Sequence, residues 1–296
     1  FIAMNAAMGG ILWKEVKNLT PFTSEPAGRD KLIFQDIRLD ENTAIIETNR
    51  YVLTVRNSEN GFLLQDAEGN SIPSVFDEEG QSLMLTEQPY KNIYAWQQQK
   101  DDLHWILLQI DGKDIEFVHT GESMKVVGFN SVLTDIIPVE AFTGIKNEAF
   151  ASGRGYIWSR SIPLLKKAVL WGYGPDTFPF IFPQNDFVGK LNYGSIWVII
   201  GKPHNWYLQV ALGSGVLSLL CLLAFFGCLA VKIIRVFIRK EQGERTLMAF
   251  AFLSCLVGFL AAGVFNDSVV SVSPILWMLC GFGVRLTQCT EGNASG

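Results

Sequence analysis

A histidine at the mouth of a long uncharged stretch is the first residue that could do chemistry. His204 lies in a polar cluster at 202–205, and the chain then runs through 206–231 without a charged side chain. A neutral imidazole accepts a proton near neutral pH, so His204 could serve as a general base. The alternative is an interfacial residue that only ends a helix.

An arginine on a separate segment is the second candidate. Arg154 could hold a phosphate, because a guanidinium forms two parallel hydrogen bonds with phosphate oxygens. The alternative is a surface cation beside lipid headgroups. Residues near these two in the sequence could contact a substrate, and one of them, Asn205, could also orient the His204 ring. These candidate substrate-binding residues are Trp158, Arg160, Lys202 and Asn205.

Several familiar reaction centres are missing from the sequence. It has no Asp-x-Asp pair for a metal–nucleotide, no glycine-rich phosphate loop, no C-x-x-C and no H-E-x-x-H. We therefore expect no metal and no cofactor. With a net charge of −5 and no basic patch, we also expect no nucleic-acid partner. Asp176, Asp186 and Asp267 are expected to be caps or surface groups, and Asp267 stands out because it lies at membrane depth or its edge.

The elements that must position these residues begin with membrane helices. Hydrophobic residues make up 49% of the chain and concentrate in its last third. An apolar stretch of roughly 20 residues spans a bilayer, and a basic loop marks the cytoplasmic side, which places His204 at the outer face. We expect transmembrane helices at 207–231, 247–265 and 269–284, a cytoplasmic basic loop at 232–246 and a polar tail at 285–296. The short apolar segment 1–13 is expected to be the end of a truncated transmembrane helix.

The region 14–206 is expected to be extracytoplasmic. Short runs of branched and aromatic residues recur over 43–129, separated by turn signals such as Asp111-Gly112, which predicts about eight strands in a small sandwich or curled sheet. Residues 14–40 suit a connector, and 131–206 suits a helical or loop segment. The predicted fold is a polytopic α-helical membrane protein with an inserted extracytoplasmic, mainly-β domain.

Three motifs, taken in order, resemble the O-antigen ligase and O-antigen polymerase family. They are Ser-Gly-Arg at 152–154 followed by Trp158, the glycine turn LWGYGPDTF at 170–178, and PHNWYLQ at 203–209. The resemblance covers about Ser152 to Ala224, and 14–150 carries none of it. That earlier region looks like a large insertion in an outer loop.

The resemblance implies a multi-pass glycosyltransferase of the GT-C type in the bacterial cytoplasmic (inner) membrane. Such enzymes take a glycan from an undecaprenyl diphosphate-linked donor at the outer face and pass it to an acceptor hydroxyl. They use neither a metal nor a nucleotide. The family's essential histidine maps onto His204, and an arginine thought to engage the diphosphate maps onto Arg154. Another family arginine belongs to a more N-terminal region that this chain does not contain.

Two other classes of protein are compatible with the pattern. One is a non-catalytic, membrane-anchored envelope protein whose β-domain binds a glycan or another partner. The other is a transporter subunit, although helix 207–231 has few of the polar mid-helix groups that transporters use. Within the favoured class, a ligase and a polymerase differ in their acceptor, which the sequence does not report.

Overall fold

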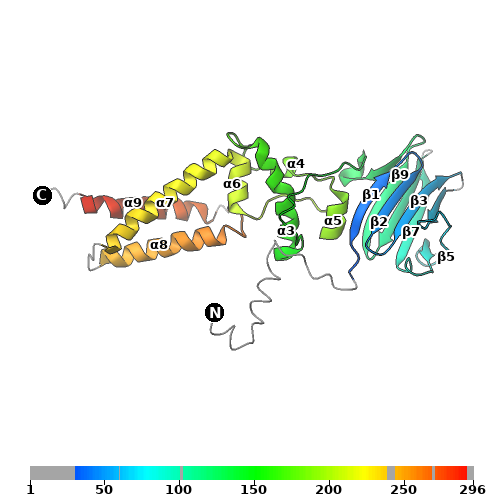
Figure 1. The fold of residues 1–296 in the computed structure, drawn as a ribbon, viewed down its shortest axis with the longest axis horizontal. Coiled ribbons are helices and arrows are strands. Elements are labelled where there is room, and N and C mark those ends of the chain that lie inside the picture. Colours follow the sequence, from blue (N-terminus) through cyan, green and yellow to red (C-terminus); the bar gives the residue numbers. More distant parts are fainter. Residues whose placement is uncertain (1–30, 60, 101–102, 239–243, 269–270, 292–296) are drawn as a thin grey trace, which may run out of the picture. The chain divides into compact units, whose positions relative to one another are not determined.

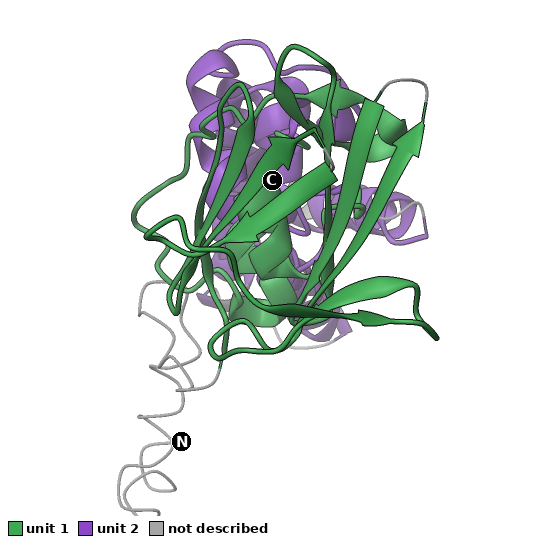
Figure 2. Ribbon diagram, turned by 90° about the vertical axis from the view of Figure 1, so that its right-hand side faces the viewer, with its two compact units in different colours: residues 1–156, 183–199 green, residues 157–182, 200–296 purple. Residues whose placement is uncertain are grey.

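The protein folds into two compact units. The structure, a computed structural model, describes residues 31–59, 61–100, 103–238, 244–268 and 271–291. Unit 1 comprises Phe1–Tyr156 and Pro183–Ile199, and unit 2 comprises Ile157–Phe182 and Ile200–Gly296 (Figure 2). The expected helix end at 1–13 lies outside the described residues, as do most of the connector 14–40 and the end of the tail.

Unit 1 is built on two antiparallel sheets (Figure 1). One has the strand order β1-β2-β3-β4, and the other has the order β11-β10-β9-β8-β7-β6-β5. Their inner faces contribute to one buried apolar core, so the two sheets form a sandwich. The strands are β1 (Phe34–Leu39), β2 (Thr43–Thr48), β3 (Val52–Ser58), β4 (Gly61–Gln65), β5 (Ser74–Asp77), β6 (Ser82–Leu85), β7 (Ile93–Lys100), β8 (Leu103–Ile110), β9 (Lys113–His119), β10 (Met124–Val127) and β11 (Leu133–Thr134).

The hydrophobic alternation of the sequence explains these strands. Along β2 every second residue is buried, from Ala44 onward, and the intervening side chains are partly exposed. The structure has a strand at each of the eight predicted segments. The Asp111-Gly112 turn joins β8 to β9, with Ile110 opposite Lys113. Asp111 and Gly112 have φ values of 52° and 73°, as a two-residue hairpin turn requires.

The sequence pattern does not predict three of the strands. Strand β1 falls in the segment expected to be a connector, because Asp36 and Arg38 interrupt its apolar residues and a bulge follows Phe34. Strands β5 and β11 are only 4 and 2 residues long. In the segment predicted to be helical or loop, residues 131–149 contain β11 and irregular chain with Pro138 and Gly144, and no described α-helix begins before Phe150.

A helix from the later part of the chain completes the core of unit 1. Helix α5 (Phe187–Tyr193) contributes Phe187 and Leu191 to the same buried cluster as the two sheets. The Asn192 amide accepts a hydrogen bond from Phe34 N at 3.0 Å and donates one to Phe34 O at 2.8 Å. Residues 183–199 therefore belong to the same unit as the β-rich part predicted at 43–129.

Unit 2 is helical, and its long apolar stretch is divided. The helix predicted at 207–231 is instead α6 (Trp206–Ser214) followed by α7 (Val216–Ile238), because Gly215 between them has a φ of 107°. The remaining helices are α3 (Phe150–Ser161), which begins in unit 1, the 3-10 helix η2 (Ile162–Lys167), α4 (Phe178–Ile181), α8 (Glu244–Ala262) and α9 (Ser273–Glu291).

One described helix is long and apolar enough to cross a bilayer. Its apolar segment is Val216–Val236, which has a mean hydropathy of 2.5. Only 17% of the most apolar 18-residue stretch of this segment is buried within the protein. An apolar helix that the protein leaves uncovered suits contact with lipid chains. The corresponding segments of the two later helices, Thr246–Ala262 and Ser273–Thr287, are shorter. The structure thus offers one candidate span where the sequence predicted three.

A buried lysine in α5 gives unit 1 a testable pH dependence. Burial lowers the pKa of Lys190 from its ordinary 10.5 to about 8, although Asp186 opposes the shift. Between these values the unfolded chain binds a proton that the folded chain does not, so stability should rise with pH over this window. Urea denaturation measures this as the free energy of unfolding at several pH values. The free energy should rise with pH in wild type and rise less in Lys190→Met. The exposed Lys91→Met is the control, and equal slopes in all three proteins would contradict the prediction.

Candidate active site

His204 pairs with an acid that comes from a distant part of the chain. The distance from His204 Nδ1 to Asp267 Oδ2 is 2.9 Å, and the two side chains are 47% and 7% exposed. The second carboxylate oxygen, Oδ1, is buried and has no hydrogen-bond partner among the described residues. A nearly buried carboxylate therefore holds one edge of a half-exposed imidazole ring.

This pairing sets which ring nitrogen can react. With Nδ1 donating its proton to the carboxylate, the lone pair of the neutral ring lies on Nε2. No described residue forms a hydrogen bond with Nε2. The carboxylate also stabilises the positive charge that the ring acquires when Nε2 accepts a proton. The arrangement is suited to general-base catalysis.

The segment that carries His204 is held to the end of α8 by hydrogen bonds. Trp206 N donates to Gly263 O at 2.7 Å, Asn205 Nδ2 donates to Val264 O at 2.9 Å, and the Gln209 side chain accepts from Ser268 N at 2.7 Å. These bonds bring the acid and the histidine together.

Asn205 has a different role from the one expected of it. Its side-chain oxygen accepts from Leu208 N at 2.9 Å, which caps the start of α6. Its amide nitrogen is committed to the bond with Val264. The acid Asp267, and not Asn205, orients the His204 ring.

Trp158 holds the backbone of the residue before His204. Its indole Nε1 donates to Pro203 O at 2.9 Å in a buried hydrogen bond, and its ring centroid lies 5.9 Å from that of Phe265. His204 itself has a φ of 48°, a left-handed conformation that is uncommon outside glycine. Strained backbone of this kind persists where neighbouring contacts impose it, often at functional sites. Trp158 is thus a positioning residue, while substrate contact by its indole stays a prediction.

The glycine turn at 170–178 lies against the break between α6 and α7 and forms hydrogen bonds there. Tyr173 N donates to Leu212 O at 2.7 Å and Gly174 N donates to Gly213 O at 3.0 Å. Any side chain at Gly172 would clash with the backbone of Gly213. The turn therefore satisfies carbonyl groups that α6 leaves open at its C-terminal end.

Arg154 belongs to unit 1, whereas the histidine pair belongs to unit 2. Its Nη1 donates to Ala151 O at 2.9 Å, and its Nε is buried without a hydrogen-bond partner among the described residues. The remaining predicted contacts, Arg160 and Lys202, lie in unit 2. Arg160 donates to the Ser159 hydroxyl at 2.8 Å, and Lys202 is exposed. The described residues contain no cluster of three His, Cys, Asp or Glu side chains that could hold a metal ion.

Comparison with known families adds to this geometry. The model of the O-antigen ligase family matches residues 123–223. This stretch is an O-antigen ligase domain. The similarity to this family suggests membrane association and a glycosyltransferase role as a ligase or polymerase of lipid-linked glycans. No curated protein and no solved structure shows a significant match to the chain.

The O-antigen ligase match contains Arg154, Trp158 and His204 but ends before Asp267. The sequence did single out this acid. Asp267 lies just beyond the predicted helix 247–265, which has no charged residue, and an ionised group within a bilayer is costly. What the sequence could not supply was its partner, because 62 residues separate Asp267 from His204 along the chain. Only the hydrogen bonds between the 203–209 and 263–268 segments reveal the pair.

The glycine turn of the O-antigen ligase domain can be tested by adding one methyl group. Gly172→Ala should destabilise unit 2 by about 1–3 kcal/mol, because the new Cβ has no space against Gly213. Gly201→Ala is the matched control, since a Cβ there meets nothing within 4 Å. Thermal unfolding of the purified proteins in detergent gives the measurement. Equal midpoints for the two variants would contradict the packing described here.

Proposed function

We propose that this protein is a membrane glycosyltransferase that uses a lipid-linked glycan. It moves the glycan from an undecaprenyl diphosphate-linked donor to an acceptor hydroxyl at the outer face of the bacterial cytoplasmic membrane. The observation that supports this most strongly is the His204–Asp267 pair, whose histidine lies within the O-antigen ligase match and just before the apolar helices. The acceptor, whether glycan, lipid or protein, distinguishes a ligase from a polymerase.

In the proposed reaction His204 removes the proton from the acceptor. As Nε2 takes this proton, the acceptor oxygen attacks the anomeric carbon of the donor's first sugar. The bond from that carbon to the phosphate oxygen breaks, and the electron pair leaves with undecaprenyl diphosphate. Asp267 stabilises the imidazolium that forms, and the ring later releases its proton to solvent. No metal is required for these steps.

Arg154 is proposed to stabilise the leaving group. Negative charge develops on the diphosphate as the bond to the sugar breaks, and a fixed guanidinium can offset that charge. Of its five N–H donors, one on Nη1 bonds Ala151 O, so the guanidinium has further donors to offer an anion. Arg160 and Lys202 are proposed to add positive charge for the same lipid-linked substrate.

The membrane arrangement is part of the proposal. Helix α7 ends near Lys232 and Arg235, and basic residues favour the cytoplasmic side. His204 would then lie at the outer face, where a glycan stays in water while its lipid stays in the bilayer. We propose that α8 and α9 accompany α7 in a GT-C-like, multi-pass body, with 14–206 outside the cytoplasm and 232–246 within it.

Loss of the base should abolish transfer without removing the protein from the membrane. We expect His204→Gln to reduce glycan transfer by about 100-fold or more, the usual scale for a general base. Transfer from an undecaprenyl diphosphate-linked glycan in membranes, normalised to protein abundance, is the measurement. The matched control is His104→Gln, a strand β8 histidine of unit 1 that bonds Asn57. Near wild-type transfer by His204→Gln would reject the assignment and favour the membrane-anchored binding protein.

A further inference from the structure

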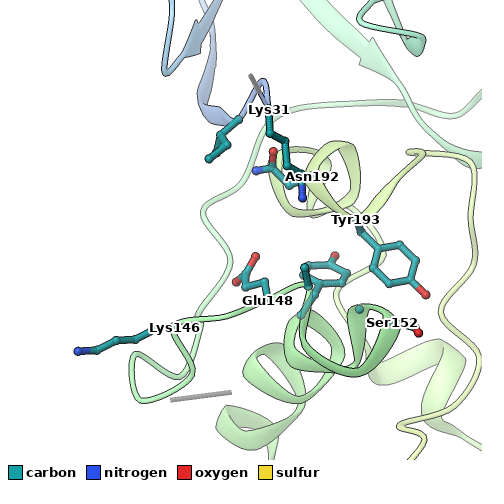
Figure 3. A pocket seen from close by; sticks show the side chains of 10 residues that line it. Lys31, Lys146, Glu148, Ser152, Asn192 and Tyr193 are labelled. Carbon is teal, nitrogen blue, oxygen red and sulfur yellow. The ribbon is translucent and has the colours of Figure 1, made fainter. Parts of the chain in front are cut away.

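Two parts of unit 1 have no role in the transfer step. One is a cavity of about 670 Å³, lined by side chains from the segment before β1, from α3 and the loop before it, and from the end of α5 (Figure 3). Its charged side chains Lys31 and Glu148 interact with other groups of the protein, so they do not define a ligand class. The other is the outer face of the seven-stranded sheet, which points away from the sandwich core and carries the stronger chemical signal.

Alternation along β7, β8 and β9 determines which side chains lie on this outer face. The residues between them are buried in the core, namely Ile93, Ala95, Ile106, Leu108, Ile110, Ile115 and Phe117. The strand register arranges the outward residues in three rows across the sheet, which are Tyr94–Gln109–Asp114, Trp96–Leu107–Glu116 and Gln98–Trp105–Val118. Three of these nine positions hold aromatic rings, and none holds a basic residue.

The three aromatic residues are neighbours on the sheet. The rings of Tyr94 and Trp96 stack with centroids 6.3 Å apart and an interplanar angle of 30°. Trp105 lies diagonally across from Trp96 on the next strand, because its direct partner is Gln98. The turn between β5 and β6 holds Trp96 in place, since the indole Nε1 donates a hydrogen bond to Gly80 O at 2.9 Å. Part of the aromatic surface is therefore fixed before any ligand arrives.

Amide and carboxylate groups flank these rings. Gln109 Nε2 donates a hydrogen bond to Asp114 Oδ1 at 3.0 Å, which leaves further acceptor sites on the carboxylate. Burial raises the pKa of Glu116, so hydroxyl donors at its carboxylate would be favourable. The exposed Gln98 side chain has both a donor and an acceptor. The face thus combines apolar rings with hydrogen-bonding groups of both kinds.

This combination matches a neutral glycan better than other occupants. The C–H face of a pyranose packs on an aromatic ring, and sugar hydroxyls donate to carboxylates and bond with amides. An apolar protein surface would bury the carboxylates of Asp114 and Glu116 without partners. An anionic polymer or an anionic membrane surface would be repelled by the same two groups.

We propose that the outer face of β7, β8 and β9 binds a neutral chain of pyranose sugars. The site lies wholly within unit 1 and holds sugars that are not reacting, so it requires no contact with His204. The identity of the chain, as the glycan that the protein transfers or extends, rests on the proposed function. The binding of neutral sugars rests on the sheet alone.

Binding to immobilised glycans tests the proposal without requiring turnover. The full chain in lipid nanodiscs is applied to α-glucan, β-glucan, mannan, galactan and N-acetylglucosamine oligomers, with polygalacturonate as the anionic comparison. Wild type should bind at least one neutral glycan and should not bind polygalacturonate. Trp105→Ala should weaken binding of the preferred glycan about tenfold or more, because a stacking surface is lost.

The matched control is an aromatic residue on the other side of the same sheet. Phe76 is 59% exposed, but its register with Leu83, and that of Leu83 with Ala95, places it on the face opposite to Trp96. Phe76→Ala should therefore bind as wild type does. Trp105→Phe should retain most of the binding, because it keeps a ring and removes no hydrogen bond to the described residues.

Further variants keep the test decisive. Gln98→Ala, at an exposed position, should also weaken binding if Trp105→Ala fails to fold. His204→Gln should bind the glycan normally, so loss of transfer and loss of glycan binding are separate failures. The proposal is overturned if wild type binds none of the neutral glycans, or if Trp105→Ala and Gln98→Ala bind as tightly as wild type. A dimer in analytical ultracentrifugation that Trp105→Ala dissociates would also overturn it, because a second copy would then cover the face.

Discussion

The contact between His204 and Asp267 is the interaction on which the candidate site depends. A carboxylate that is 7% exposed is costly unless a partner offsets its lost hydration, and the imidazole supplies that partner. The pair in turn requires the chain at 203–209 to lie against the end of α8. Trp158, Asn205 and Gln209 all form hydrogen bonds that maintain this contact. Much of the sequence around His204 that resembles the O-antigen ligase family therefore positions the His204 ring.

Glycine provides the second constraint. A continuous helix through 206–238 would leave no place for the 170–178 turn, which bonds to the carbonyls of Leu212 and Gly213. Gly215 permits the break through its positive φ, and Gly172 permits the close approach of two backbones. The break frees carbonyl groups at the end of α6, and this turn satisfies those of Leu212 and Gly213.

The sequence predicted the β-sandwich well because its signals are local. Alternating apolar residues and the Asp111-Gly112 turn locate β8 and β9 without reference to the rest of the chain. The same reasoning predicted one helix at 207–231, because glycines within an apolar run do not reveal the distant turn that bonds to the helix there. The sequence reasoning also did not assign 183–199 to the sandwich, and it did not pair Asp267 with His204. Each of these features depends on contacts between segments far apart in the chain.

The central claim, that His204 and Asp267 act as one catalytic unit, is tested most directly by a double-mutant cycle. Glycan transfer in membranes would be compared for His204→Gln, Asp267→Asn and the combined variant. If the acid works only through the ring, the double variant should be no slower than His204→Gln alone. Multiplication of the two single losses would show independent roles and contradict the account.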